Sequence, residues 1–182
     1  MILDKFKLDG KIALVTGASV GLGQGMAFAL AEAGADVACH CLNDGEADET
    51  VAKIKAMGRR AVSIAGDMSD KTTPKRVIDA VVAEFGRIDI LINNAGMIRR
   101  TPAVDFSEED WSTVIAVNLS SVFRTSQAAG RYMIEQGAGT IVNIASLLSF
   151  QCGITVPAYT ASKSGVAGVP KALATGRAHN KV

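Results

Sequence analysis

The sequence KIALVTGASVGLG, residues 11–23, decides the fold class. Its first six residues are mostly apolar or β-branched and predict a short buried strand. Gly17, Gly21 and Gly23 follow and lead directly into a helical pattern over 21–33. Glycines in this context let the backbone turn tightly against a pyrophosphate, while the helix N-terminus offers free amides and a partial positive charge. The stretch therefore predicts a strand, a phosphate-binding turn and a helix.

The rest of the chain repeats the strand-then-helix pattern. Parallel neighbours in a sheet need crossover connections, usually helices, so five such units indicate an α/β fold. We expect a Rossmann-type doubly wound parallel sheet with helices on both faces, forming one domain over residues 1–182. Pro170 should kink the last helix or produce an irregular turn. The predicted strands are 11–16, 36–42, 61–65, 88–93 and 140–145, and the predicted helices are 21–33, 46–57, 70–85, Ser107–Gln136 and Val156–Ala178.

Composition and charge exclude several classes of protein. Lys and Arg number 19 against 18 Asp and Glu, so no broad field attracts nucleic acid or an anionic membrane. The three cysteines form no disulfide framework and have no metal-ligand partners at zinc spacing. The N-terminus lacks a signal-peptide core, and no apolar run reaches membrane-spanning length. We expect a cytoplasmic protein with no metal, nucleic acid or membrane partner.

Polar motifs follow the predicted strands, at the edge where ligands bind in such sheets. They are Asp67, the run Asn93-Asn94-Ala95-Gly96, Ser146, and Tyr159-x-x-x-Lys163 in the last helix. Together with the glycine turn, these motifs make the whole chain resemble the short-chain dehydrogenase/reductase family. The resemblance implies hydride transfer between a nicotinamide cofactor and an alcohol or ketone.

The catalytic residue types are chemically coherent. Tyr159 and Lys163 are four residues apart and share one helix face. A phenol, with an ordinary pKa of about 10, is a poor base unless a neighbouring ammonium favours its phenolate. We therefore assign Tyr159 as acid/base, Lys163 as its tuner and Ser146 as the holder of the substrate oxygen. The resemblance adds Asn118, whose counterpart holds a water that links the lysine to solvent. Individually, a capping serine, a core tyrosine and a surface lysine are simpler interpretations.

The cofactor is expected at the glycine turn. An acidic side chain closing the second strand would bind a ribose 2′-hydroxyl, and an arginine would accept a 2′-phosphate. The chain has Cys41-Leu42-Asn43-Asp44 there and Val20 inside the turn, which favours NAD, with NADP as the alternative. The predicted cofactor-binding residues are Gly17, Ser19, Gly21, Leu22, Gly23, Asp67, Met68, Asn94, Ala95, Gly96, Tyr159 and Lys163.

Residues 96–100 and 148–157 are similar to the sugar-acid branch of the family. Arginine binds carboxylates in a bidentate manner, so Arg99 or Arg100 can select an acidic sugar, beside Ser146 and Tyr159 as substrate contacts. We expect a substrate such as 2-deoxy-D-gluconate or 2-dehydro-3-deoxy-D-gluconate. The alternatives are a 3-oxoacyl-[acyl-carrier-protein] reductase and a non-catalytic nucleotide-binding fragment.

The resemblance also concerns chain length and assembly. Family members continue beyond this point with two further strands and a segment that covers the substrate, so we expect the domain to be C-terminally incomplete, ending in a poor helix terminus over 175–180. Family members commonly pair through the helices corresponding to Ser107–Gln136 and Val156–Ala178, which implies a dimer or tetramer. The small residues Ala128, Ala129, Gly130, Ala167 and Gly168 should let these helices approach closely.

Overall fold

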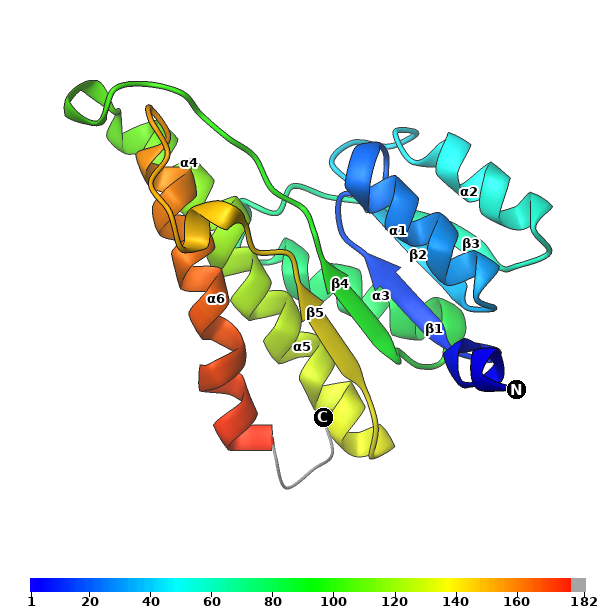
Figure 1. Ribbon diagram of the computed structural model, residues 1–182. Coiled ribbons are helices and arrows are strands. Elements are labelled where there is room, and N and C mark those ends of the chain that lie inside the picture. The colour runs from blue at the N-terminus through cyan, green and yellow to red at the C-terminus, as the bar shows by residue number, and fades with distance from the viewer. Residues whose placement is uncertain (178–182) are drawn as a thin grey trace.

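The computed structural model describes residues 1–177, which form a single parallel sheet flanked by helices (Figure 1). The strand order is β3-β2-β1-β4-β5, with every neighbouring pair parallel. The order reverses between β1 and β4, which is where ligands bind in sheets of this kind. This confirms the predicted Rossmann-type fold. The strands are β1 Ile12–Val15, β2 Asp36–Cys41, β3 Ala61–Ala65, β4 Ile90–Asn93 and β5 Thr140–Asn143.

Helices cover both faces of the sheet. On one face lie α1 (Gly21–Glu32) and α2 (Asp48–Ala56), and on the other lie α3 (Thr73–Phe85) and α5 (Ser121–Gln136) (Figure 1). The helix α6 (Pro157–Arg177) runs beside α5, and α4 (Glu108–Ile115) precedes α5. Short 3₁₀ helices are Ile2–Phe6, Ala103–Asp105 and Leu147–Ser149.

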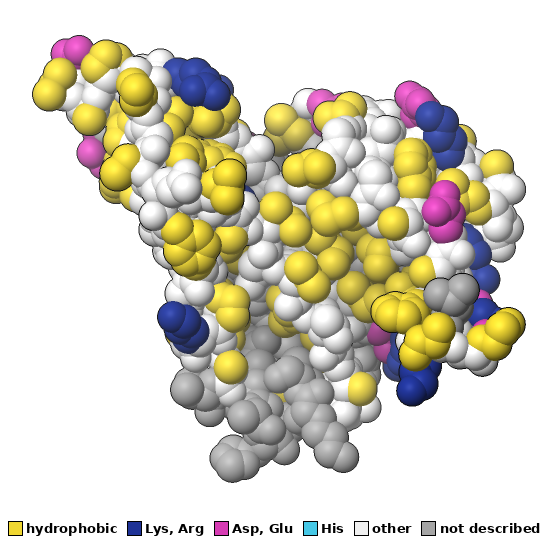
Figure 2. Space-filling view, viewed as in Figure 1, with side chains coloured by type: hydrophobic (Ala, Val, Ile, Leu, Met, Phe, Trp, Pro, Cys, Tyr) yellow, Lys and Arg dark blue, Asp and Glu magenta, His cyan; other side chains and the backbone are white. Residues whose placement is uncertain are grey.

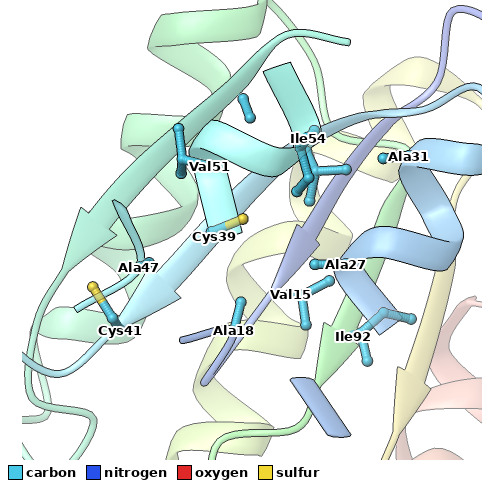
Figure 3. Close-up of a cluster of buried hydrophobic side chains, with 12 residues drawn as sticks. Val15, Ala18, Ala27, Ala31, Cys39, Cys41, Ala47, Val51, Ile54 and Ile92 are labelled. Carbon is cyan, nitrogen blue, oxygen red and sulfur yellow. The ribbon is translucent and has the colours of Figure 1, made fainter. Parts of the chain in front are cut away.

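Two apolar clusters hold the layers together. On the α1/α2 face, Cys39 of β2 packs with Ala27 and Ile54 of the covering helices (Figure 3). On the opposite face, Leu14 of β1 packs with residues of α3 and α5 such as Met133. Leu14, Ile54 and Met133 are fully buried, and each burial contributes about 1.5–3 kcal/mol. The strands are thereby fixed, and with them the loops at their carboxyl ends.

The prediction of one uninterrupted helix over Ser107–Gln136 is wrong at its centre. The Ser107 hydroxyl accepts a hydrogen bond from the Asp110 amide at 3.1 Å, so the helix begins where the capping pattern placed it. After α4, a π-helical turn spans Ala116–Ser120 before α5 begins. Such turns insert one residue into the helical repeat and are frequent at functional sites. Asn118 lies within this turn and is fully buried.

The last helix continues through Pro170 to Arg177, so the proline does not end it. Ala178 and the rest of the predicted terminus lie outside the described residues.

On the sheet face that α1 and α2 cover, β4 and β5 have no covering helix in the described part of the chain (Figure 1). Hydrophobic side chains are exposed there, between α1 and α6 (Figure 2). Val142 of β5 is 40% exposed there. Among residues 1–177, no helix is both long and apolar enough to span a bilayer.

Candidate functional site

The glycine turn between β1 and α1 requires its glycines. Gly17 and Gly21 have φ values of +66° and +60°, a backbone region that side chains disfavour. Gly23 is buried in the first turn of α1, and a Cβ there would overlap the carbonyl oxygen of Gly17. The backbone is thus packed too closely for side chains. A backbone of this shape can approach a pyrophosphate, as a dinucleotide requires.

Asn94 holds the turn from the β4 side. Its Nδ2 donates to the carbonyl oxygens of Thr16 and Gly17 at 2.8 and 3.1 Å. In return, the Thr16 hydroxyl accepts from the backbone amides of Asn94 and Ala95, both at 2.9 Å. Asn94 therefore locks the loop after β1 to the loop after β4, and the shape of the turn depends on it.

A cavity of about 390 Å³ opens beside this turn. It is lined by Gly17, Ser19, Asp67, Met68, Ala95 and Gly96, all predicted cofactor residues. Leu22 is 76% exposed on α1 and does not line the cavity. The other predicted cofactor residues that do not line it are Gly21, Gly23, Asn94, Tyr159 and Lys163. A larger cavity, about 510 Å³, lies between α3 and α5, but none of the predicted site residues lines it. The smaller cavity is therefore the candidate cofactor site.

Sequence reasoning missed eight residues that line this cavity, among them His40, Leu42 and Glu46 near the end of β2. The Glu46 carboxylate accepts from the Asn43 side-chain amide at 2.7 Å and from the backbone amides of Leu42 and Asn43, both at 3.2 Å. The Asn43 side chain foremost, with these amides, holds the pKa of Glu46 below its ordinary value. A fixed anionic group thus lies just after β2.

Tyr159 and Lys163 lie one turn apart on α6. The Lys163 ammonium is buried, donates to the Ile144 carbonyl oxygen at 2.5 Å, and lies 5.8 Å from the centre of the Tyr159 ring. Burial lowers the pKa of Lys163. The amine is therefore fixed between the end of β5 and the tyrosine.

Ser146 and Asn118 complete the predicted catalytic set. The Ser146 hydroxyl accepts from the Leu148 amide at 3.2 Å at the start of a 3₁₀ turn, and Ser149 in the same turn donates to the Lys163 carbonyl at 2.7 Å. The Asn118 amide exchanges hydrogen bonds with the Met97 backbone at 2.8 and 2.9 Å and donates to Ser162 of α6 at 3.2 Å. Hydrogen bonds thus join the loops after β4 and β5 to α6, which carries Tyr159.

The two arginines predicted to contact substrate differ in environment. Arg99 lines the cavity, and its Nε lies 3.3 Å from the Asp110 carboxylate. Arg100 is exposed, and no ion pair of its own is seen in the described part of the chain. The next residue, Thr101, donates from its amide to the Thr155 carbonyl at 2.9 Å. Thr155 has a φ of +61°, a strained value for a β-branched residue, in the loop that leads to Tyr159.

Within residues 1–177, no group of His, Cys, Asp and Glu side chains could hold a metal ion. A doubly wound sheet with a glycine turn at its switch point, and a tyrosine–lysine pair on α6 whose lysine is buried, defines a nucleotide-dependent oxidoreductase of the Rossmann class. The sequence also matches the short chain dehydrogenase family over residues 11–182. The chain belongs to this family.

Within this family, the chain is similar to dehydrogenases named for sugar acids. The chain is 53% identical over 175 residues to a 2-dehydro-3-deoxy-D-gluconate 5-dehydrogenase of Dickeya dadantii, covering 96% of this chain and 68% of that protein. It is 50% identical to the protein of that name in Bacillus subtilis, covering 94% and 66%. The crystal structure of a gluconate 5-dehydrogenase from Burkholderia cenocepacia, in complex with NADP and tartrate, has a TM-score of 0.93 and 36% identity, covering 100% of this chain and 71% of that one.

Proposed function

We propose that the chain carries the cofactor site and catalytic residues of an NAD-dependent oxidoreductase acting on the secondary alcohol or ketone of a sugar acid. The observation that carries this proposal is the tyrosine–lysine pair, held by the loop after β5 at the same sheet edge as the glycine turn. Two carboxylate-bearing sugar derivatives are the substrates we favour: 2-dehydro-3-deoxy-D-gluconate and 2-deoxy-D-gluconate. The names of similar proteins support the first of these substrates.

The side chains have separate roles in this proposal. When bound, the dinucleotide supplies a nicotinamide that accepts or returns hydride. The Tyr159 hydroxyl moves the proton to or from the substrate oxygen. The Lys163 ammonium, fixed by the Ile144 carbonyl, places positive charge 5.8 Å from the centre of the Tyr159 ring. Because the Ser146 hydroxyl accepts its bond from the Leu148 amide, its own hydrogen is free for the substrate oxygen.

Asn118 is a positioning residue in this proposal. Both ends of its side-chain amide are occupied by Met97 and Ser162, so the side chain joins the loop after β4 to α6. Loss of this link should let α6, and with it Tyr159, move relative to the cofactor cavity.

Glu46 favours NAD over NADP. Its carboxylate lines the cavity at the end of β2, where the adenosine ribose lies in folds of this class. A carboxylate accepts a hydrogen bond from a 2′-hydroxyl and repels a 2′-phosphate. The gluconate 5-dehydrogenase structure contains NADP, so the preference must be tested on this chain. Glu46→Gln should improve NADPH binding relative to NADH, and an unchanged ratio of the two dissociation constants would contradict this role.

Arg100 is the better candidate for the substrate carboxylate. Arg99 is already opposite Asp110, whereas Arg100 is exposed beside the loop that leads to Tyr159. We propose that Arg100 binds the carboxylate and that Arg99 supports the loop through α4.

Turnover of alternative substrates tests the proposed function. The purified chain should interconvert NADH and NAD with 2-dehydro-3-deoxy-D-gluconate or 2-deoxy-D-gluconate, and Tyr159→Phe should abolish this while retaining NADH binding. Faster turnover of an acetoacetyl thioester would favour the carrier-protein reductase alternative. Binding of NADH without turnover of any of these compounds would favour the non-catalytic alternative.

We also propose self-association through α5 and α6. Ala129 and Gly130 are buried within the chain's own fold, so we propose that exposed positions of these helices make the contact. Phe123 and Ile134 of α5 are instead exposed, 43% and 37%, and are available to a second copy. Light scattering after size exclusion would measure the mass. A cytoplasmic location stays a prediction.

A further inference from the structure

His40 links two loops of the cofactor cavity. The residue lies on β2 and is only 3% exposed. Its Nδ1 accepts a hydrogen bond from the Gly17 amide at 3.3 Å, and its Nε2 lies 2.9 Å from the Gly66 carbonyl oxygen. Since Nδ1 accepts and a carbonyl cannot donate, the ring proton belongs on Nε2. A neutral imidazole in one tautomer therefore joins the glycine turn to the loop after β3.

The main chain of His40 strengthens the same connection. Its carbonyl oxygen accepts from the Ala18 amide at 2.8 Å, so this one residue engages two successive amides of the turn. Asn94 engages the carbonyl oxygens of Thr16 and Gly17 from the opposite side. The turn is thus held by its amides from β2 and by its carbonyls from the loop after β4. The conformation of the glycine turn therefore depends on both His40 and Asn94.

We propose that His40 is a positioning residue of the dinucleotide site, whose neutral ring holds the glycine turn and the loop after β3 in the arrangement that receives the adenosine half of the cofactor. This inference rests on the nucleotide-binding part of the proposed function. Protonation of Nδ1 would turn the acceptor into a donor facing the Gly17 amide, so the link to the turn breaks while the link to Gly66 remains. By linkage, a ligand that needs the neutral ring binds less tightly as the ring is protonated.

Burial and the groups around His40 together set the pH range in which its ring is protonated. Arg76 of α3 donates to the Ala65 carbonyl at 2.9 Å, and Glu46 and Asp67 line the same cavity. Burial is the largest influence on the pKa of His40 and lowers it, the bond to Gly66 opposes this, and the Arg76 charge lowers the pKa further. The change should therefore fall below about pH 6.5. Glu46, whose pKa is below its ordinary value, stays ionised in that range.

Titration of NADH into the full chain from about pH 8 to about pH 5 tests the inference. The wild-type dissociation constant should rise roughly three- to tenfold as one hydrogen bond is lost. His40→Asn keeps an acceptor near the Nδ1 position, loses the link to Gly66 and does not titrate, so its dissociation constant should vary little with pH. His40→Gln extends its amide toward Gly66 and loses the Gly17 link, so at about pH 8 it should bind as weakly as acidified wild type.

Two comparisons separate positioning from general stability. Ile54→Val removes one methylene group from the buried cluster on the α1/α2 face of the sheet without touching the turn, so it should keep the wild-type pH profile. His179 remains in the His40→Asn variant, so an equal rise in both proteins would overturn the assignment to His40. A flat wild-type profile would overturn it as well. Failure of the wild type to bind NADH at any pH would instead overturn the proposed function.

Discussion

Gly23→Ala should damage the turn and the cofactor site together. The new Cβ would lie 2.6 Å from Asn94 Nδ2 and 2.8 Å from the Gly17 carbonyl carbon, and it would overlap the carbonyl oxygen. Overpacking of this kind costs about 1–3 kcal/mol. Loss of the Asn94 bond to Gly17 adds about 1 kcal/mol, and the better helix propensity of alanine returns about 1 kcal/mol. We expect the free energy of unfolding to fall by about 1–3 kcal/mol. NADH binding should weaken at least tenfold, which corresponds to about 1.4 kcal/mol of binding free energy.

Gly25→Ala is the matched control in the same helix. Gly25 is exposed, and a Cβ there meets nothing within 4 Å, so only helix propensity changes. This variant should be up to about 1 kcal/mol more stable than wild type and should bind NADH normally. Urea unfolding measures the first quantity and NADH titration the second. Equal unfolding midpoints and equal NADH affinities for the two variants would refute the close-approach argument.

Four further substitutions test other parts of the structure. Lys163→Met should lower turnover at least about 100-fold in a steady-state assay, because the charge beside the phenol is lost. Asp89→Asn should lower the free energy of unfolding by about 1–3 kcal/mol at neutral pH, measured with urea. Burial alone would raise the pKa of Asp89, but the Arg87 guanidinium, then the Ile12 amide and Lys11, hold it below its ordinary value. The difference in unfolding free energy between wild type and Asp89→Asn should therefore shrink only below about pH 4. Arg100→Gln should raise KM for the sugar acid about tenfold with kcat little changed. Arg99→Gln should have a smaller effect, because the exposed pair of Arg99 with Asp110 contributes at most about 1 kcal/mol. Equal effects of the two variants would contradict the assignment of Arg100 to the substrate carboxylate.

The strands and most helices could be predicted because their residues act locally. The run over 11–16 is apolar enough to be a buried strand, and glycines end several of the helices. The capping pattern at Ser107 likewise depends on residues three positions apart. The π turn at Ala116–Ser120 could not be predicted in this way. It is held by Asn118 bonding to Met97, a contact between residues far apart in the sequence.

The residues of the site also fall into two groups: those in local sequence motifs, which could be predicted, and those placed by contacts between distant parts of the chain, which could not. Gly17, Ser146, Tyr159 and Lys163 stand in motifs, and the structure places them at one sheet edge. His40 lies between two cysteines in an apolar run, so its pattern is that of a core strand, and only the approach of Gly17 and Gly66 gives it partners. Glu46 lies beyond the end of β2, in the loop before α2, and not at the strand end where an acidic ribose-binding residue is expected. A loop folding back toward Leu42 brings its carboxylate there.

The π turn offers a way to sort related sequences. An α-helix turns about 100° per residue, so removing one residue between Ala116 and Ser120 would restore a regular helix and rotate Asn118 away from Met97 by about that angle. Such a relative would keep its strands, its glycine turn and its tyrosine–lysine pair, and a comparison of those motifs alone would not distinguish it. A single-residue gap in this helix would therefore identify chains that retain the fold but have lost the connection between the loop after β4 and α6.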